Sequence, residues 1–162
     1  MVLNLDESVV AKHLSYDKLI PAMERALAEF SAGKVHQPVR EIIALEEGKR
    51  YFGIMPAALA DGMGAKLVSF FPGNANSAHH THYATITLFD PQTGVPLAFM
   101  DGTLITEMRT AAVSAAITKY AAAPDAKVLA LVGSGVQAKA HLEALRHAVS
   151  YTHLTLPTNR EV

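Results

Sequence analysis

Three cationic side chains of this sequence stand where a purely structural role is hard to justify. Lys66 lies inside an apolar run that would form a strand buried on both faces, and Arg109 lies on a helix of small residues. Arg40 opens an earlier strand. A buried cation is costly unless it is paired, and arginine can hold a carboxylate through two parallel hydrogen bonds. These residues therefore indicate a site for a small anionic substrate.

A structural explanation competes at each of these positions. Arg40 and Arg109 could pair with surface acids such as Glu41 or Glu107. Lys66 could be a lysine that protects the edge of a sheet. The residue pattern by itself leaves both explanations open.

A glycine-rich turn indicates a second kind of chemistry. Residues 132–138 read Val-Gly-Ser-Gly-Val-Gln-Ala, which matches G-x-G-x-x-A, and they directly follow an apolar run and open a helix. The first glycine permits a tight turn, the second lets the backbone approach a pyrophosphate, and the third small residue lets the helix pack closely on the strand. The helix N-terminus offers unpaired N–H groups to the phosphates. The turn therefore predicts dinucleotide binding, with a merely structural turn as the alternative.

The loop of residues 72–82 contains three of the eight histidines. A zinc site is conceivable there, because histidine is a common zinc ligand. However, the chain has no cysteine and no HExxH helix, and neighbouring loop histidines point in different directions. We therefore expect no metal site, and we interpret the loop as a polar border of a ligand cleft.

The composition disfavours several classes of partner. The net charge of −1 gives no basic field for nucleic acid. The N-terminus is acidic where a secretory signal would be basic. No apolar run is long enough for a transmembrane helix. We expect a cytoplasmic protein without a nucleic-acid or membrane partner.

Two helices and a run of strands must position the cations. Asp6 predicts the cap of a short helix, and a longer helix should begin at Ser15 or Asp17, carry Pro21 in its first turn and stop at Gly33. Short connections, the clearest over residues 90–94, predict a mainly antiparallel sheet and an α+β segment. Its expected strands run from Arg40 to Leu45, Arg50 to Met55, Ala65 to Phe71, Tyr83 to Phe89 and Val95 to Met100.

The last third of the chain changes character. An alanine-rich helix is expected from Leu104 to Ala123, then an apolar strand from Lys127 to Val132 and a helix from Val136 to His147. Strand, glycine turn and helix in direct succession predict the start of an α/β domain near residue 125.

Four separated segments together resemble the ornithine cyclodeaminase and mu-crystallin family: residues 36–40 (His-Gln-Pro-Val-Arg), 64–68 (Gly-Ala-Lys-Leu-Val), 100–112 and 133–138. The resemblance covers about residues 1–148. It implies a substrate-binding and dimerisation domain over residues 1–124, and the first strand, turn and helix of an incomplete Rossmann domain over residues 125–148. It also implies NAD or NADP as the cofactor and a homodimer for the full-length protein.

The resemblance implies roles for particular residues. Arg40 and Arg109 resemble the residues that grip the substrate carboxylate, and Lys66 resembles the catalytic lysine beside the reacting carbon. The residues expected near the cofactor are Thr81, His82, Arg109, Gly133, Ser134, Gly135, Val136 and Gln137.

Several activities are compatible with this resemblance. One is NAD(P)H-dependent reduction of a cyclic ketimine, a C=N bond beside a carboxylate, in amino-acid metabolism; the stretches at residues 36–40 and 100–102 favour it slightly. Another is the conversion of ornithine to proline and ammonia, and an archaeal-type alanine dehydrogenase is a third relative. A non-enzymatic alternative is the binding of a thyroid-hormone-like ligand or a structural crystallin role.

The final residues depart from the family pattern. The run from Ser150 to Val162 resembles translated adapter sequence, so we expect a non-native tail over residues 149–162. Alternatively, a real strand runs from Tyr151 to Leu156. One strand and one helix cannot cover a Rossmann sheet. We therefore expect the chain as given to be an inactive fragment that binds NAD(P) weakly or not at all. The residue that selects NAD or NADP, about 20 residues past the turn, and the acidic residue of the cyclodeaminases are not assigned.

Overall fold

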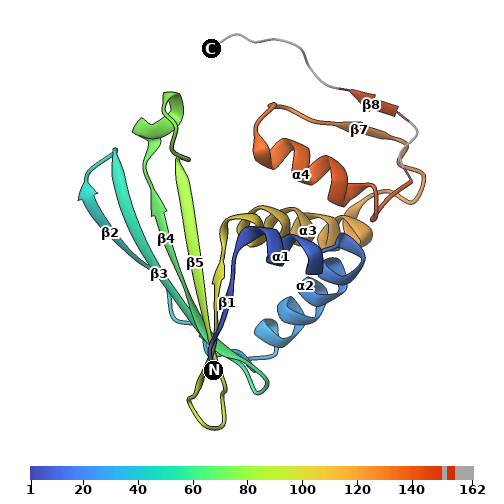
Figure 1. The fold of residues 1–162 in the computed structure, drawn as a ribbon. Helices are drawn as coiled ribbons and strands as arrows, with labels where there is room; N and C mark the ends of the chain where they lie inside the picture. Colours follow the sequence, from blue (N-terminus) through green and yellow to red (C-terminus); the bar gives the residue numbers. More distant parts are fainter. Residues whose placement is uncertain (151–152, 156–162) are drawn as a thin grey trace. The chain divides into compact units, whose positions relative to one another are not determined.

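The computed structural model describes residues 1–150 and 153–155, and the chain divides into two compact units (Figure 1). The first unit comprises Met1–His13 and Glu29–Thr106, and the second comprises Leu14–Ala28 and Glu107–Val162. Strands dominate the first unit and helices the second. The expected α+β class is confirmed, whereas the domain boundary near residue 125 stays a prediction.

The first unit is built on a six-stranded sheet with the order β1-β6-β5-β4-β3-β2. Neighbouring strands from β2 to β6 are antiparallel, as the short turns predicted. Strand β1 pairs in parallel with β6 and was missed, because three residues are too few to show alternation. The strands are β1 (Leu3–Leu5), β2 (Glu41–Glu46), β3 (Arg50–Ala58), β4 (Met63–Phe70), β5 (His82–Phe89) and β6 (Pro96–Asp101).

Two aspartates direct local structure in this unit. The Asp6 carboxylate accepts a hydrogen bond from the Val9 N–H at 2.9 Å and so caps helix α1 (Glu7–His13), as predicted. The Asp90 carboxylate accepts the Gln92 and Thr93 N–H groups at 2.9 and 2.8 Å, which closes the turn between β5 and β6. The Ser8 hydroxyl and then the Val9 N–H lower the pKa of the Asp6 carboxyl, and the bonds from Thr93 and Gln92 lower the pKa of the Asp90 carboxyl.

Helix α2 (Tyr16–Ser31) begins directly after Ser15 and is followed by Gly33, whose φ of 69° suits a helix stop. The expectation that Pro21 lies in its first turn is wrong. Pro21 lies inside the helix, where it has no N–H for the Asp17 carbonyl. Helix α2 tolerates this single lost bond because its apolar side is held by packing, with Ile20 buried.

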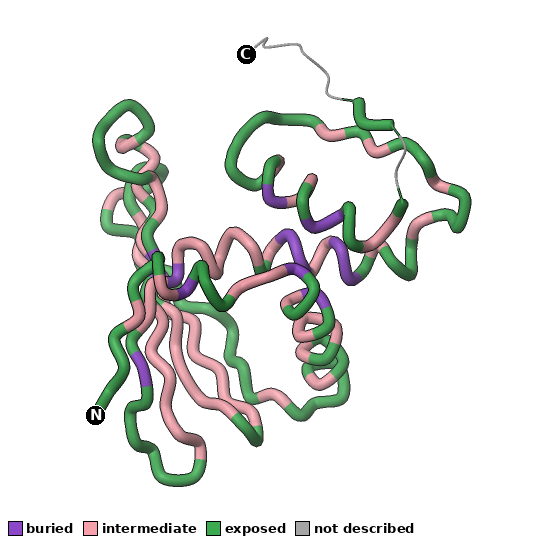
Figure 2. The backbone as a smooth tube through the Cα atoms, turned by 45° about the vertical axis from the view of Figure 1, so that its right-hand side comes forward, coloured by how far each residue is buried: buried purple, intermediate pink, exposed green. Residues whose placement is uncertain are grey.

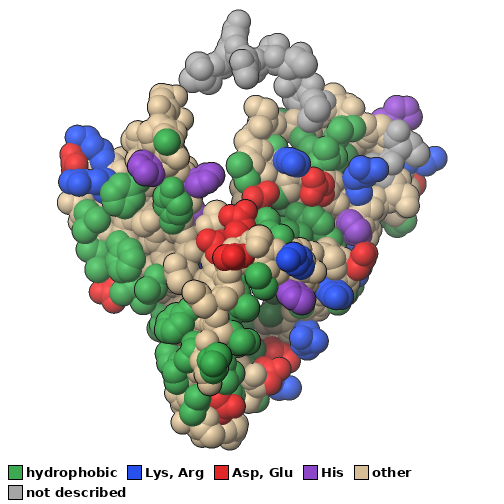
Figure 3. All heavy atoms as spheres, viewed as in Figure 1, with side chains coloured by type: hydrophobic (Ala, Val, Ile, Leu, Met, Phe, Trp, Pro, Cys, Tyr) green, Lys and Arg blue, Asp and Glu red, His purple; other side chains and the backbone are tan. Residues whose placement is uncertain are grey.

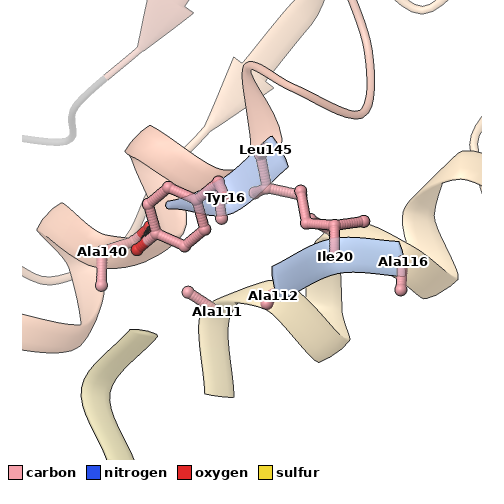
Figure 4. Close-up of a cluster of buried hydrophobic side chains, with 9 residues drawn as sticks. Tyr16, Ile20, Ala111, Ala112, Ala116, Ala140 and Leu145 are labelled. Carbon is pink, nitrogen blue, oxygen red and sulfur yellow. Dashed lines mark hydrogen bonds between the residues drawn. The ribbon is translucent and has the colours of Figure 1, made fainter. Parts of the chain in front are cut away.

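The core of the second unit is made largely of alanine. Tyr16 and Ile20 of α2 pack with Ala112 and other buried residues of helix α3 (Thr103–Ala121) and helix α4 (Val136–Leu145), as Figure 4 shows. Figure 2 shows that buried positions gather on these helices, whereas most strand positions are intermediate or exposed. Methyl side chains allow the helix backbones to approach closely. The buried alanines are Ala111, Ala112, Ala115, Ala116, Ala140 and Ala144.

A two-stranded parallel sheet completes the described part of the second unit. It pairs β7 (Val128–Ala130) with β8 (His153–Thr155). Strand β8 lies within the range from Tyr151 to Leu156, for which a real strand was the alternative to a non-native tail. The remainder of the expected tail from Tyr151, residues 151–152 and 156–162, lies outside the described residues. No helix in the described ranges is long and apolar enough to cross a membrane.

Candidate substrate and dinucleotide sites

Lys66 is half-buried on β4 and contacts the first turn of α3. Its Nζ donates a hydrogen bond to Thr106 Oγ1 at 3.4 Å. The expectation that β4 is buried on both faces is wrong, because Leu67 on the opposite face is 38% exposed. A lysine with partial solvent access can bury its methylene stem while its amine stays within reach of a small anion.

His82 lies on the same face of the sheet as Lys66. Lys66 is paired with Ile86 across β4 and β5, and His82 precedes Ile86 by an even number of residues, so alternation places both side chains on one side. Burial, and after it the positive charge of Lys66, lowers the pKa of the His82 imidazole. The site therefore holds a lysine amine near an imidazole that favours its neutral form.

Gly102 brings the start of α3 close to β5. Its N–H donates to the Ala84 carbonyl at 2.8 Å, and a Cβ at Gly102 would lie 3.0 Å from the Ala84 side chain. The Asp101 carboxylate accepts the Thr103 N–H at 2.8 Å and caps the helix. These contacts hold the first turn of α3 against the sheet, where the Thr106 hydroxyl meets the Lys66 amine. Thr106 was not predicted, although its position three residues before Arg109 on one helix face was a usable signal.

The two predicted arginines occupy different units. Arg40 is exposed immediately before β2 in the first unit, and within residues 1–150 and 153–155 it forms no hydrogen bond or ion pair, so the surface pair with Glu41 is not formed. Arg109 is exposed on α3 in the second unit and has an interaction partner. The structure thus brings Lys66, Thr106 and His82 together within one unit. Thr81, which directly precedes His82, is half-buried, and its carbonyl accepts the Phe71 N–H at 2.7 Å.

The glycine turn leads from β7 into α4 with an open backbone. Gly133 has a φ of 107°, which a side chain would strain. Gly135 stands directly before α4, and no side chain caps the helix within the described chain. A Cβ at Gly135 would meet no atom within 4 Å. The turn therefore leaves space beside the start of α4 that a pyrophosphate could occupy. Ser134, Val136 and Gln137 are exposed there as well.

The histidine loop shows ring packing rather than a ligand cluster. The rings of His80 and Tyr83 meet edge to face with their centroids 5.6 Å apart. The His80 N–H donates to the Tyr83 hydroxyl at 3.0 Å. No group of three or more His, Cys, Asp or Glu side chains suited to a metal occurs among the residues that the structure describes.

The second unit also has an open apolar hollow of about 430 Å³ between α2 and α3. Leu27, Ile117 and Tyr120 are among the residues that line it, together with Glu24 at its polar end. None of the predicted site residues lines this hollow, so it is distinct from the candidate sites.

Comparison with known proteins identifies a family. Residues 2–161 match the model of the ornithine cyclodeaminase/mu-crystallin family. The chain is 43% identical over 160 residues to ketimine reductase mu-crystallin of Rattus norvegicus, covering 95% of this chain and 50% of that protein.

Two solved structures share the fold over almost the whole chain. One is Thermococcus litoralis Delta(1)-pyrroline-2-carboxylate reductase in complex with NADH and L-proline, with a TM-score of 0.91 and 38% identity over 96% of this chain and 49% of that one. The other is an archaeal alanine dehydrogenase dimer with bound NAD, with a TM-score of 0.91 and 34% identity over 96% and 48%. The chain thus spans about half the length of the relatives it matches.

Proposed function

Because the chain belongs to the ornithine cyclodeaminase/mu-crystallin family, we propose that it supplies the substrate site and the pyrophosphate-binding turn of an NAD(P)H-dependent reductase of cyclic imines that carry a carboxylate. The activity is proposed for the extended protein, meaning this chain continued by the second half that its relatives have. The similar proteins reported above include a ketimine reductase and a Delta(1)-pyrroline-2-carboxylate reductase. Both are named as reductases of an imine, and the second is named for a pyrroline carboxylate, which favours reduction over cyclodeamination.

The contact between Lys66 and Thr106 is the observation that carries this proposal. The ammonium group is half-buried and aligned by the Thr106 hydroxyl at 3.4 Å, and it lies on the His82 side of the sheet. There the ammonium can hold a proton at the imine nitrogen and stabilise the iminium form that accepts electrons. We assign this catalytic role to Lys66.

The remaining substrate and cofactor residues are assigned by their chemistry and the family relationship. Arg40 and Arg109, both exposed residues, would hold the substrate carboxylate, since a guanidinium group can form two parallel hydrogen bonds with it. Gly133, Ser134, Gly135, Val136 and Gln137 would hold the pyrophosphate of NAD or NADP, and Thr81, His82 and Arg109 would approach the rest of the cofactor. When bound, NAD(P)H supplies the hydride that reduces the C=N carbon.

We also propose that the extended protein forms a homodimer through the sheet face opposite Lys66, here called the Leu67 face. Alternation along the paired strands places Ile43, Leu67, Tyr83 and Phe99 on this face, and each is between 38% and 45% exposed. Figure 3 shows hydrophobic side chains gathered over the strands. Large apolar side chains exposed on one sheet face favour burial against a second copy, and the similar archaeal alanine dehydrogenase is a dimer.

For the 162-residue chain itself we propose weak NAD(P) binding and no turnover. The strand and turn that would receive the cofactor expose Val128 and Val132, which are 61% and 88% accessible. Apolar side chains exposed to this extent beside the turn indicate a binding surface without the packing that would hold it rigid.

The activity is tested by supplying the extended protein with cyclic imino acids of five- and six-membered rings and following the oxidation of NADH and of NADPH. We expect oxidation that depends on the imine. Release of ammonia from ornithine without imine-dependent oxidation would instead establish a cyclodeaminase. Absence of both reactions, with binding of an iodinated aromatic ligand, would overturn the enzyme assignment.

A further inference from the structure

We propose that Ser114 of α3 and His141 of α4 form a hydrogen-bonded clasp that positions the glycine turn. The inference rests on the proposed function, because positioning the turn matters only if it binds a dinucleotide. Ser114 and His141 are positioning residues in this proposal, and neither is expected to touch the cofactor. Both belong to the second unit.

Two contacts define the clasp. Ser114 Oγ lies 3.0 Å from His141 Nε2, and His141 Nδ1 lies 2.7 Å from the Gln137 carbonyl oxygen. A carbonyl can only accept, so Nδ1 must carry a proton, and in the neutral imidazole Nε2 is then the acceptor. The Ser114 hydroxyl therefore donates to Nε2, since its alternative acceptor, the Thr110 carbonyl, is 3.5 Å away. The structure assigns the Nδ1–H tautomer to His141.

The surrounding interface explains why such a clasp would be needed. The contact between α3 and α4 consists largely of buried methyl groups, including Ala111, Ala115, Ala140 and Ala144. Dispersion contacts between methyl groups have little directional preference, so they hold the rotation of α4 about its axis less precisely than a directional bond does. A hydrogen bond has a defined geometry, and this one connects α3 to the side chain held on the first turn of α4.

The clasp ends at Gln137, which follows Gly135 and Val136 at the start of α4. Fixing the Gln137 carbonyl fixes the rotation of the first turn, and with it the direction of the N–H groups that would meet a pyrophosphate. A second tether supports the same helix, because the Tyr16 hydroxyl donates to the Ala140 carbonyl at 3.0 Å. Rotation of α4 is thus restrained from both α2 and α3.

The first test is spectroscopic and uses the 162-residue chain. Long-range ¹H–¹⁵N correlation spectra of the neutral His141 ring should show a protonated Nδ1 and an unprotonated Nε2. In Ser114→Ala the Nε2 resonance should move toward that of an unbonded ring nitrogen, and Ser114→Thr should restore it. A protonated Nε2 in the unmutated chain would overturn the clasp.

The second test uses the extended protein and separates positioning from general damage. We expect Ser114→Ala to raise the KM for NADPH or NADH about fivefold, the usual effect of one hydrogen bond, without changing the KM for the imine or the kcat at saturating cofactor. Ser114→Thr should recover the cofactor KM. Thr118→Ala is the matched control, because the Thr118 hydroxyl donates to the Ser114 carbonyl within α3.

The outcomes distinguish this inference from the proposed function. If the unmutated protein reduces imines but Ser114→Ala behaves like Thr118→Ala, the positioning role is wrong and the function stands. If the unmutated protein neither binds NAD(P)H nor reduces imines, the proposed function fails, and the positioning role fails with it. If Ser114→Ala raises the KM for the cofactor and the KM for the imine equally and also lowers kcat, the variant is damaged in general and the proposal is overturned.

Discussion

Lys66 and His82 share one face of the first unit's sheet, and burial together with the charge of Lys66 lowers the pKa of the His82 imidazole. The pair sets the electrostatic character of the candidate substrate site. Because the His82 imidazole favours its neutral form, the ammonium group of Lys66 remains the proton donor that can protonate a bound imine. This relationship leads to two predictions, one for catalysis and one for stability.

Replacement of Lys66 by methionine should remove the proton donor while keeping much of the side-chain bulk. We expect imine reduction by the extended protein to fall by about 100-fold or more, and the pKa of His82, followed by NMR in the 162-residue chain, to rise toward its ordinary value. Lys49→Met is the control, because Lys49 pairs with Glu46 at the exposed β2–β3 turn. An unchanged rate in Lys66→Met would contradict the catalytic assignment.

The lowered pKa of His82 predicts a pH dependence of stability. In the unfolded chain His82 takes up a proton near its ordinary pKa of 6.5, whereas in the folded chain it does so only at a lower pH. Between these two pH values the unfolded state binds more protons, so the stability of the folded chain falls as the pH drops. Urea unfolding at about pH 7.5 and about pH 5.5, on either side of that ordinary pKa, should show a smaller loss in His82→Gln than in the unmutated chain. His79→Gln, in the exposed loop, should keep the full loss.

Substitution of Gly135 by alanine should separate folding from cofactor binding. The added Cβ would meet no atom within 4 Å, so the stability should change by no more than about 1 kcal/mol. In the extended protein the same methyl group would stand where a pyrophosphate approaches, and NADPH binding should weaken about tenfold, or about 1.4 kcal/mol. Fluorescence titration gives the affinity. Gly73→Ala, also in open space, should bind normally, and equal binding by both variants would refute the assignment of the turn.

Tyr16 is expected to contribute to the stability of the second unit. Burial, and then the nearby Glu143 and Glu107 carboxylates, raises the pKa of Tyr16 to about 12. Tyr16→Phe removes the hydrogen bond to the Ala140 carbonyl and should lower the free energy of unfolding by about 1 kcal/mol. Tyr120→Phe should have no measurable effect, since Tyr120 is 79% exposed. Denaturant unfolding of the two variants makes the comparison.

A charge on the Leu67 face should prevent the proposed dimer. Leu67→Glu would place a carboxylate in an apolar interface, which is costly without a partner, so the extended protein should elute as a monomer in size-exclusion chromatography with light scattering. Val39→Glu introduces the same charge at an exposed residue before β2 and should leave the dimer intact. A dimer that survives Leu67→Glu would place the interface elsewhere.

The local features of this protein could be predicted from the sequence because they depend on neighbouring residues. The Asp6 cap, the Asp90 turn and the stop at Gly33 each involve a side chain or a φ angle within a few residues. The glycine turn before α4 is local in the same way. Five strands of the first unit's sheet were predicted because each is long enough to show its pattern.

Other features depend on which distant residues meet, and only the tertiary structure decides that. The parallel pairing of Leu3–Leu5 with β6, the contact of Lys66 with Thr106, and the bond between Ser114 and His141 join residues from 27 to more than 90 positions apart. Strand register and helix rotation determine these contacts, and neither can be predicted from the residues that are close in sequence to each contact. The sequence therefore identified the cations and the turn, whereas the fold determined which side chains surround them.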